Sequence, residues 1–203
     1  MKGRFNWNRR TTESLKQAAD FLKQAIEKDP HYALAYAGLA ETYALFTAYS
    51  VGSTKDSMPQ AKAAAQRALE LDDSLAAPHA TLGLYLIEYE WDRIGGEREF
   101  RAIELDPNYA TARQWFATDV LAAAKRFDEA LAELRRAEEL DPLSPIIGTN
   151  LGNTLVNARA VMMRRWHNTN SRPKFCIRSP GFGRGLWLKR NVSGSHPRNA
   201  ESI

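Results

Sequence analysis

The chain has 203 residues, of which 44% are hydrophobic and 26% are charged, as in an ordinary globular protein. No run of about 18 apolar residues occurs, so no membrane span is expected. The basic N-terminus has no apolar stretch behind it, which excludes a secretory signal and favours a cytoplasmic location, although an upstream targeting segment could be missing. The single cysteine, Cys176, excludes an internal disulfide framework.

The charge is unevenly distributed along the chain. Residues 1–160 contain 19 lysines and arginines and 23 acidic residues, whereas residues 161–203 contain 9 basic residues and one acid, Glu201. The net charge of +4 therefore comes entirely from the last 43 residues. Nucleic-acid binding would have to depend on that segment, and a packed core on the first 160 residues.

A repeated segment organises the first part of the chain. Its copies end at residues 30, 73, 107 and 142, which gives steps of 43, 34 and 35, and the long first step contains an insertion near residues 51–59. The copies are AIEKDP at 25–30, ALELDD at 68–73, AIELDP at 102–107 and AEELDP at 137–142.

Each copy is predicted to end a helix. Apolar residues before it recur at helical spacing, and the Asp-Pro pair then stops the helix because proline has no N–H to donate and restricts the residue before it. A second helix begins two or three residues later, for example over 33–43 and 110–117. Small residues recur at matched places of these second segments (Gly38 or Ala40, then Gly83, Ala117 and Gly152), which predicts close approach of neighbouring helices.

These segments resemble the tetratricopeptide (TPR) family, whose signature repeats at 34 residues. Residues 36–43 match it with alanine in place of the central glycine, residues 79–86 and 148–155 match its Leu-Gly centre with altered ends, and residues 113–120 match most weakly. The resemblance covers about residues 1–160. It implies an all-α, right-handed superhelix of antiparallel helix pairs. It also implies a concave groove, lined by the first helix of each pair, that takes a peptide or partner protein.

The opening stretch KGRFNWN at residues 2–8 resembles the start of TPR segments in some bacterial multidomain regulators. Residues 1–8 would then be the stump of a first helix, and a usual upstream partner domain would be missing. We accordingly divide the chain into a partial repeat (1–30), a repeat array (31–159) and a basic tail (160–203). Three helix pairs are expected between about residues 32 and 142, followed by a lone helix at 143–159. An unrelated helical bundle is the alternative fold.

The tail is predicted to be unstructured, since no helical periodicity is evident after Val161. One hypothesis is that it is translated out of frame. With suitable codons, residues 162–170 shifted by one base read Tyr-Asp-Glu-Ala-Leu-Ala-Gln-Tyr-Gln, which resembles FDEALAEL at 127–134 and falls one period later. The alternative is a genuine basic tail that binds phosphates and stacks bases, and the codons for Arg164 and Arg165 decide between the two.

The sequence favours a non-catalytic binding module that uses no cofactor and no metal. No nucleophile–base pair, phosphate loop or metal-ligand spacing occurs, which argues against an enzyme. Nucleic-acid association through the tail is the alternative function. The groove lacks the Lys/Asn clamp for carboxylates known from chaperone-binding TPR domains. The predicted groove residues are Glu41, Leu84, Gln114, Thr118, Thr149, Asn150 and Asn153.

The last predicted helix should expose an apolar face carrying Ile147, Leu151, Leu155 and Val156, because no second helix follows to cover it. We therefore predict self-association that grows with protein concentration. Light scattering over a concentration series measures it, and a monomer at the highest concentration would contradict the prediction.

Overall fold

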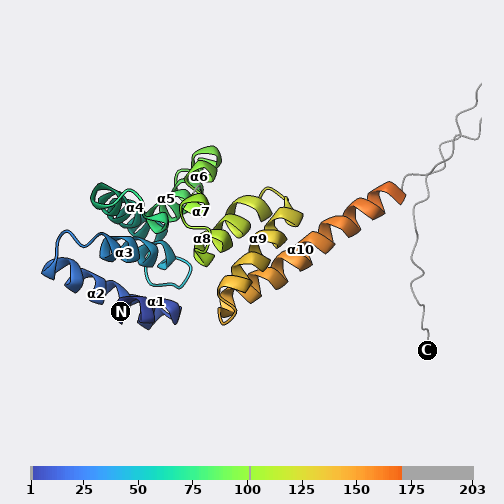
Figure 1. The fold of residues 1–203 in the computed structure, drawn as a ribbon. Coiled ribbons are helices and arrows are strands. Elements are labelled where there is room, and N and C mark those ends of the chain that lie inside the picture. Colours follow the sequence, from blue (N-terminus) through green and yellow to red (C-terminus); the bar gives the residue numbers. More distant parts are fainter. Residues whose placement is uncertain (1, 101, 171–203) are drawn as a thin grey trace, which may run out of the picture.

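The computed structural model describes residues 2–100 and 102–170, which form helices and turns and contain no strand (Figure 1). The predicted all-α fold of stacked helix pairs is confirmed. The elements in chain order are α1 (Lys2–Asn8), α2 (Thr12–Lys28), α3 (Ala33–Leu45), α4 (Thr54–Leu71), α5 (Ala76–Glu88), α6 (Arg93–Glu99), α7 (Ala102–Leu105), α8 (Ala110–Trp115), the π-helical turns η1 (Phe116–Ala122), α9 (Phe127–Leu140) and α10 (Pro145–Asn170).

Three helix pairs lie between residues 33 and 140, as the repeat predicts. α3 packs on α4, α5 packs on α6 and α7, and the continuous helix of α8 and η1 packs on α9. The short α1 packs on α2 at one end of the array, and α10 packs on α9 at the other. Successive pairs also touch one another, since α3 contacts α5 and α5 contacts α8, so the pairs stack into a superhelix.

The helix ends follow the local sequence. Thr11 caps α2, because its hydroxyl accepts from the Ser14 N–H at 3.1 Å while the Ser14 hydroxyl accepts from the Thr11 N–H at 3.0 Å. Asp29 and Pro30 end α2, and Asp141 and Pro142 end α9. The repeated Asp-Pro pair thus sets where the helix before it ends, as in α2 and α9.

Alanine is the main residue where helices cross. The small side chain lets two backbones approach while leaving no void between them. The fully buried alanines are Ala18, Ala40, Ala61, Ala65, Ala68, Ala80, Ala102, Ala112, Ala117, Ala130 and Ala137. The closest approach uses two glycines: a methyl group on Gly96 would lie 2.9 Å from the Gly83 carbonyl oxygen, so α5 and α6 almost touch there.

α10 differs from the prediction at its far end. It continues to Asn170, so the expected loss of helical structure at residue 160 is wrong. The physical reason is that no glycine or proline interrupts residues 153–170, and arginine, alanine and methionine there favour a helix. The rest of the predicted tail, with Cys176, lies outside the described residues, and the frameshift hypothesis stays a hypothesis.

The expected apolar face of α10 is only partly exposed. Ile147 is buried and Leu151 is half-buried against α9 and η1, whereas Leu155 and Val156 are 47% and 68% exposed. No atom lies within 4 Å of a methyl group built on Gly152, so the close packing predicted there is absent. Figure 1 shows the second half of α10 projecting away from the array, where no described helix covers it.

Replacing Gly96, at a close helix crossing, and Gly152, in open space, by alanine should change stability in opposite directions. Gly96→Ala should lower the free energy of unfolding by about 1–3 kcal/mol, because the new methyl group meets backbone and the Ile87 side chain. Gly152→Ala should raise it by up to about 1 kcal/mol, because alanine favours the helix and meets nothing. Urea unfolding followed by circular dichroism measures both, and equal effects would contradict the close crossing of α5 and α6.

Candidate functional site: two pockets that share Trp7

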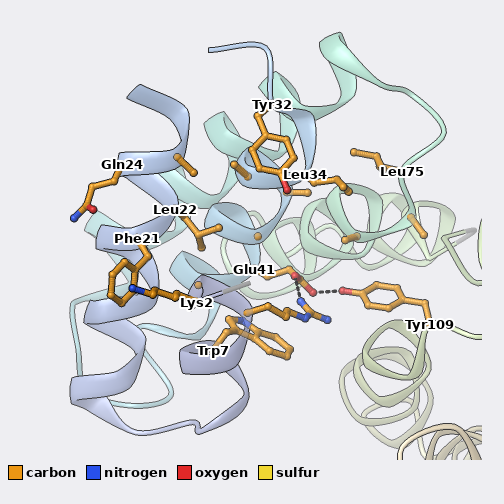
Figure 2. Close-up of a pocket in the computed structure, with 18 of the residues that line it drawn as sticks. Lys2, Trp7, Phe21, Leu22, Gln24, Tyr32, Leu34, Glu41, Leu75 and Tyr109 are labelled. Carbon is orange, nitrogen blue, oxygen red and sulfur yellow. Dashed lines mark hydrogen bonds and ion pairs between the residues drawn. The ribbon is translucent and has the colours of Figure 1, made fainter. Parts of the chain in front are cut away.

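A large pocket opens between the first repeats. Its volume is about 790 Å³, and its walls come from α1, α2, α3, the start of α5 and the turn before α8 (Figure 2). Most of the wall is apolar, with Phe21, Leu22, Tyr32 and Leu34 among the side chains that line it. We call this the large pocket. A space of this size and polarity suits an apolar side chain rather than an ion.

Glu41 lies at the inner end of the large pocket, where three segments of the array meet. Its side chain is 2% exposed. One carboxylate oxygen accepts a hydrogen bond from the Arg4 guanidinium of α1, and the other accepts from the Tyr109 hydroxyl, which precedes α8 (Figure 2). Glu41 belongs to α3, so its buried charge connects α3 with Arg4, 37 residues before it, and with Tyr109, 68 residues after it.

The charges around Glu41 are mutually stabilised. Burial raises the pKa of the Tyr109 phenol well above its ordinary value, and the neighbouring Glu41 charge adds to this. Burial lowers the pKa of Arg4, but attraction to Glu41 and Tyr109 outweighs it, so the net shift is upward. Tyr109 therefore stays a hydrogen-bond donor and Arg4 stays a cation. Each oxygen of Glu41 thus has a hydrogen-bond partner.

Trp7 separates the large pocket from a second, smaller one. Its indole ring lies between two guanidinium groups, with Arg4 at 4.2 Å and Arg10 at 3.8 Å from the ring centre. The indole Nε1–H is the one fully enclosed side-chain polar atom without a hydrogen-bond partner in the described part of the chain. Trp7 lines both spaces, so the two pockets share this wall.

The second pocket, which we call the polar pocket, has a volume of about 200 Å³. It lies between the end of α1, the inner face of α8 and the first turn of α10. Arg10, Gln114 and Asp141 bring charged and amide groups to it. A small polar space of this kind suits a charged or hydrogen-bonding group.

The structure brings two of the predicted groove residues to these pockets: Glu41 lines the large pocket and Gln114 the polar pocket. Leu84 is only 4% exposed, packs in the core and lines neither pocket, so its binding role stays a prediction. It belongs to α5, which contacts α3, α4, α6, α7, α8 and η1. The remaining predicted residues are Thr118, Thr149, Asn150 and Asn153, which line neither pocket, and their binding role stays a prediction.

Sequence reasoning missed Arg4, Trp7, Arg10 and Tyr109. A usable signal existed for Tyr109, since Asp-Pro-x-Tyr occurs at 29–32 and again at 106–109, and both tyrosines line the large pocket. Arg4 and Trp7 lie in the opening stretch that the family resemblance identified, but their pairing with α3 needs the three-dimensional fold.

Thr118 lies beside the half-buried carboxylate of Asp119, which in turn affects the more exposed Glu88. Its hydroxyl bonds the Gln114 carbonyl oxygen at 3.0 Å and the Asp119 carboxylate at 2.7 Å. Burial raises the pKa of Asp119 to about 6, although the Thr118 hydrogen bond lowers it. Burial and the Asp119 charge raise the pKa of Glu88 to about 7. No group of three or more potential metal ligands occurs among residues 2–100 and 102–170.

The comparison with solved structures defines the class of protein. The chain superposes on the TPR protein TTC0263 of Thermus thermophilus with a TM-score of 0.54, over 70% of this chain and 73% of that one, at 22% identity. The fold is therefore that of a TPR superhelix. A second TPR protein, YrrB, matches over 79% of this chain with a TM-score of 0.43 and 24% identity. No family model matches the sequence.

The sequence is also similar to part of a bacterial regulator. The transcriptional regulator HilA of Salmonella paratyphi A is 27% identical over 148 residues, which is 73% of this chain, and the same regulator from Salmonella typhimurium is 26% identical over 148 residues. The chain spans about a quarter of the length of these curated relatives (27%). None of the helices in the described part of the chain has the length and apolar character needed to cross a bilayer.

Two tyrosines at matching repeat positions provide a test of the Glu41 interaction. Tyr109→Phe should lower the free energy of unfolding by about 1.5–3 kcal/mol, because a hydrogen bond to a charged, buried acceptor is lost. Tyr32→Phe is the control, since Tyr32 lines the same pocket but its hydroxyl makes no hydrogen bond within the described residues. Urea unfolding that gave the same stability for both variants would contradict the assignment.

The raised pKa values of Glu88 and Asp119 predict a pH dependence. Both carboxyls bind protons more tightly in the folded chain, so their contribution to stability is fully present below about pH 4 and is lost as the pH rises through about 6 and 7. The melting temperature should therefore be a few degrees higher at about pH 5 than at about pH 8. Asp119→Asn should reduce that difference, and a variant with the full wild-type difference would contradict the assignment.

Proposed function

We propose that this chain is a non-catalytic interaction module that takes an apolar side chain of a partner protein or peptide into the large pocket. The single observation that supports this is the pocket itself, a mostly apolar hollow of about 790 Å³ between the first helix pairs of the array. Such repeats present extended surfaces to partners, and an apolar anchor in a pocket supplies most of the affinity.

The side chains around the large pocket support binding rather than catalysis. Glu41 is the one carboxylate deep inside, and its two oxygens are taken by Arg4 and Tyr109. Lys2 lies 5.7 Å from the Phe21 ring, so its stem covers apolar surface while its charge stays at the rim. A partner with an apolar residue next to acidic ones would match this arrangement.

The similarity to HilA supports a more specific role, as the interaction arm of a larger bacterial regulator. In this proposal the repeat array receives a protein signal, and a DNA-binding part elsewhere in the regulator acts on it. A cytoplasmic location goes with the proposal, because transcription is regulated there. The alternative, nucleic-acid binding by the basic tail, depends on residues outside those described, and no observation favours it.

Selection of peptides from a displayed random library tests the pocket. Enriched peptides should carry a conserved apolar residue. Leu34 lines the large pocket and is 57% exposed, so Leu34→Glu puts a charge on the apolar wall. The affinity of the peptides, measured by fluorescence anisotropy, should fall at least about tenfold in this variant.

The matched control is Ile94→Glu on α6, which changes a similarly exposed apolar residue away from both pockets. This control should bind the peptides like the wild type. Absence of any enriched peptide, or equal losses in the two variants, would contradict the proposed function.

A further inference from the structure

We propose that the polar pocket binds a carboxylate group, carried by the side chain or the chain end of a partner molecule. This goes beyond the apolar anchoring proposed for the large pocket. Small carboxylates can test the carboxylate site directly, without any peptide. A negative result there is therefore distinct from a negative result for apolar anchoring in the large pocket. Three independent features of the polar pocket converge on a single negative charge.

The first feature is the start of α10, a helix of 26 residues whose first turn lines the polar pocket. Pro145 has no N–H, and the N–H groups of Ile146 and Ile147 find no acceptor among the described residues. Free N–H groups at a helix start carry the positive end of the helix dipole and favour an anion.

The second feature is Gln114, whose side chain is almost completely buried, with 5% exposure, yet makes no hydrogen bond to any described group. Trp7 Nε1 is the one fully enclosed side-chain polar atom left without a partner there, so the Gln114 amide must border open space. The space that Gln114 lines is the polar pocket. A buried amide without a partner costs free energy unless a ligand or water completes its hydrogen bonds.

The third feature is Arg10, whose guanidinium makes no ion pair within the described residues and lies 3.8 Å from the centre of the Trp7 ring. Burial lowers the pKa of Arg10, so its charge is less well stabilised than that of Arg4. Its backbone has a positive φ of 50°, which turns the chain between α1 and α2. An anion in the polar pocket would supply the opposite charge that Arg10 lacks.

Asp141 decides which anion fits. Its carboxylate also lines the polar pocket and opposes any negative ligand. The charges of Arg10 and Asp141 cancel, and the start of α10 adds a partial positive charge. The net charge around the polar pocket is therefore slightly positive, which suits a singly charged carboxylate better than a doubly charged sulfate or phosphate. A volume of about 200 Å³ admits such a group but not a whole peptide.

The shared Trp7 wall places the two pockets side by side. One partner segment can therefore put an apolar side chain into the large pocket and an acidic group into the polar pocket. This chemistry differs from a lysine and asparagine clamp, since the groups that recognise the anion are Arg10, Gln114 and the start of α10.

Nuclear magnetic resonance on the full chain tests the proposal with sodium acetate as the probe, at constant ionic strength kept with sodium chloride. Acetate should shift the backbone amides of Ile146 and Ile147 and the Gln114 side-chain amide, and these shifts should saturate. Sulfate should bind more weakly than acetate. N-acetylalanine and the amide of N-acetylaspartate then distinguish a chain-end carboxylate from a side-chain one, and binding of either supports the site.

Three variants should change the affinity for acetate in different directions. Arg10→Gln should weaken acetate binding about tenfold, Gln114→Leu should weaken it several-fold, and Asp141→Asn should tighten it several-fold. Asp141 is exposed, so its variant keeps the test valid if Arg10→Gln does not fold. The proposal is overturned if acetate produces no saturable shift, if sulfate binds more tightly than acetate, or if Asp141→Asn leaves the affinity unchanged.

Discussion

The rest of the structure depends on how closely one helix approaches the next. Fully buried alanines occupy the crossings along the whole array, and at one crossing the contact is between two glycines, Gly83 and Gly96. Small side chains leave little freedom in the distance and angle between neighbouring helices. The offset from one helix pair to the next is thereby fixed, and with it the curvature that creates a concave face.

Glu41 places a carboxylate among buried residues that are mostly apolar. Arg4 and Tyr109 together supply a hydrogen-bond donor to each of its two oxygens. A buried ion pair contributes little net stability but strongly disfavours arrangements that separate its partners. In this chain it holds α1 against α3 and against the turn before α8. It therefore defines the inner end of the large pocket, and Trp7 on α1 divides that pocket from the polar one.

The local features could be read from the sequence because they depend on neighbours in the chain. The helix pairs, their 34-residue period and the Asp-Pro stops all follow from residues within one repeat. The path of α10 beyond residue 160 was missed because helix propensity persists there without an amphipathic pattern, so the periodic signal disappears while the helix continues. The burial of Leu84 in the core could not be read from the sequence, because α5 contacts elements of its own and of neighbouring repeats. The Glu41 interaction and the polar pocket join residues from opposite ends of the array, and no spacing in the sequence encodes them.

The central claim is that each helix is stable because it packs against the next copy. Hydrogen–deuterium exchange resolved along the chain tests it most directly. We expect the slowest amide hydrogen exchange in α3, α4 and α5, which pack against neighbouring helices. Fast exchange is expected in α10 beyond Val156, where the helix leaves the array. Equal protection of that end of α10 and of α4 would contradict the account, because the helices would then be stable without the stacking that forms the concave face.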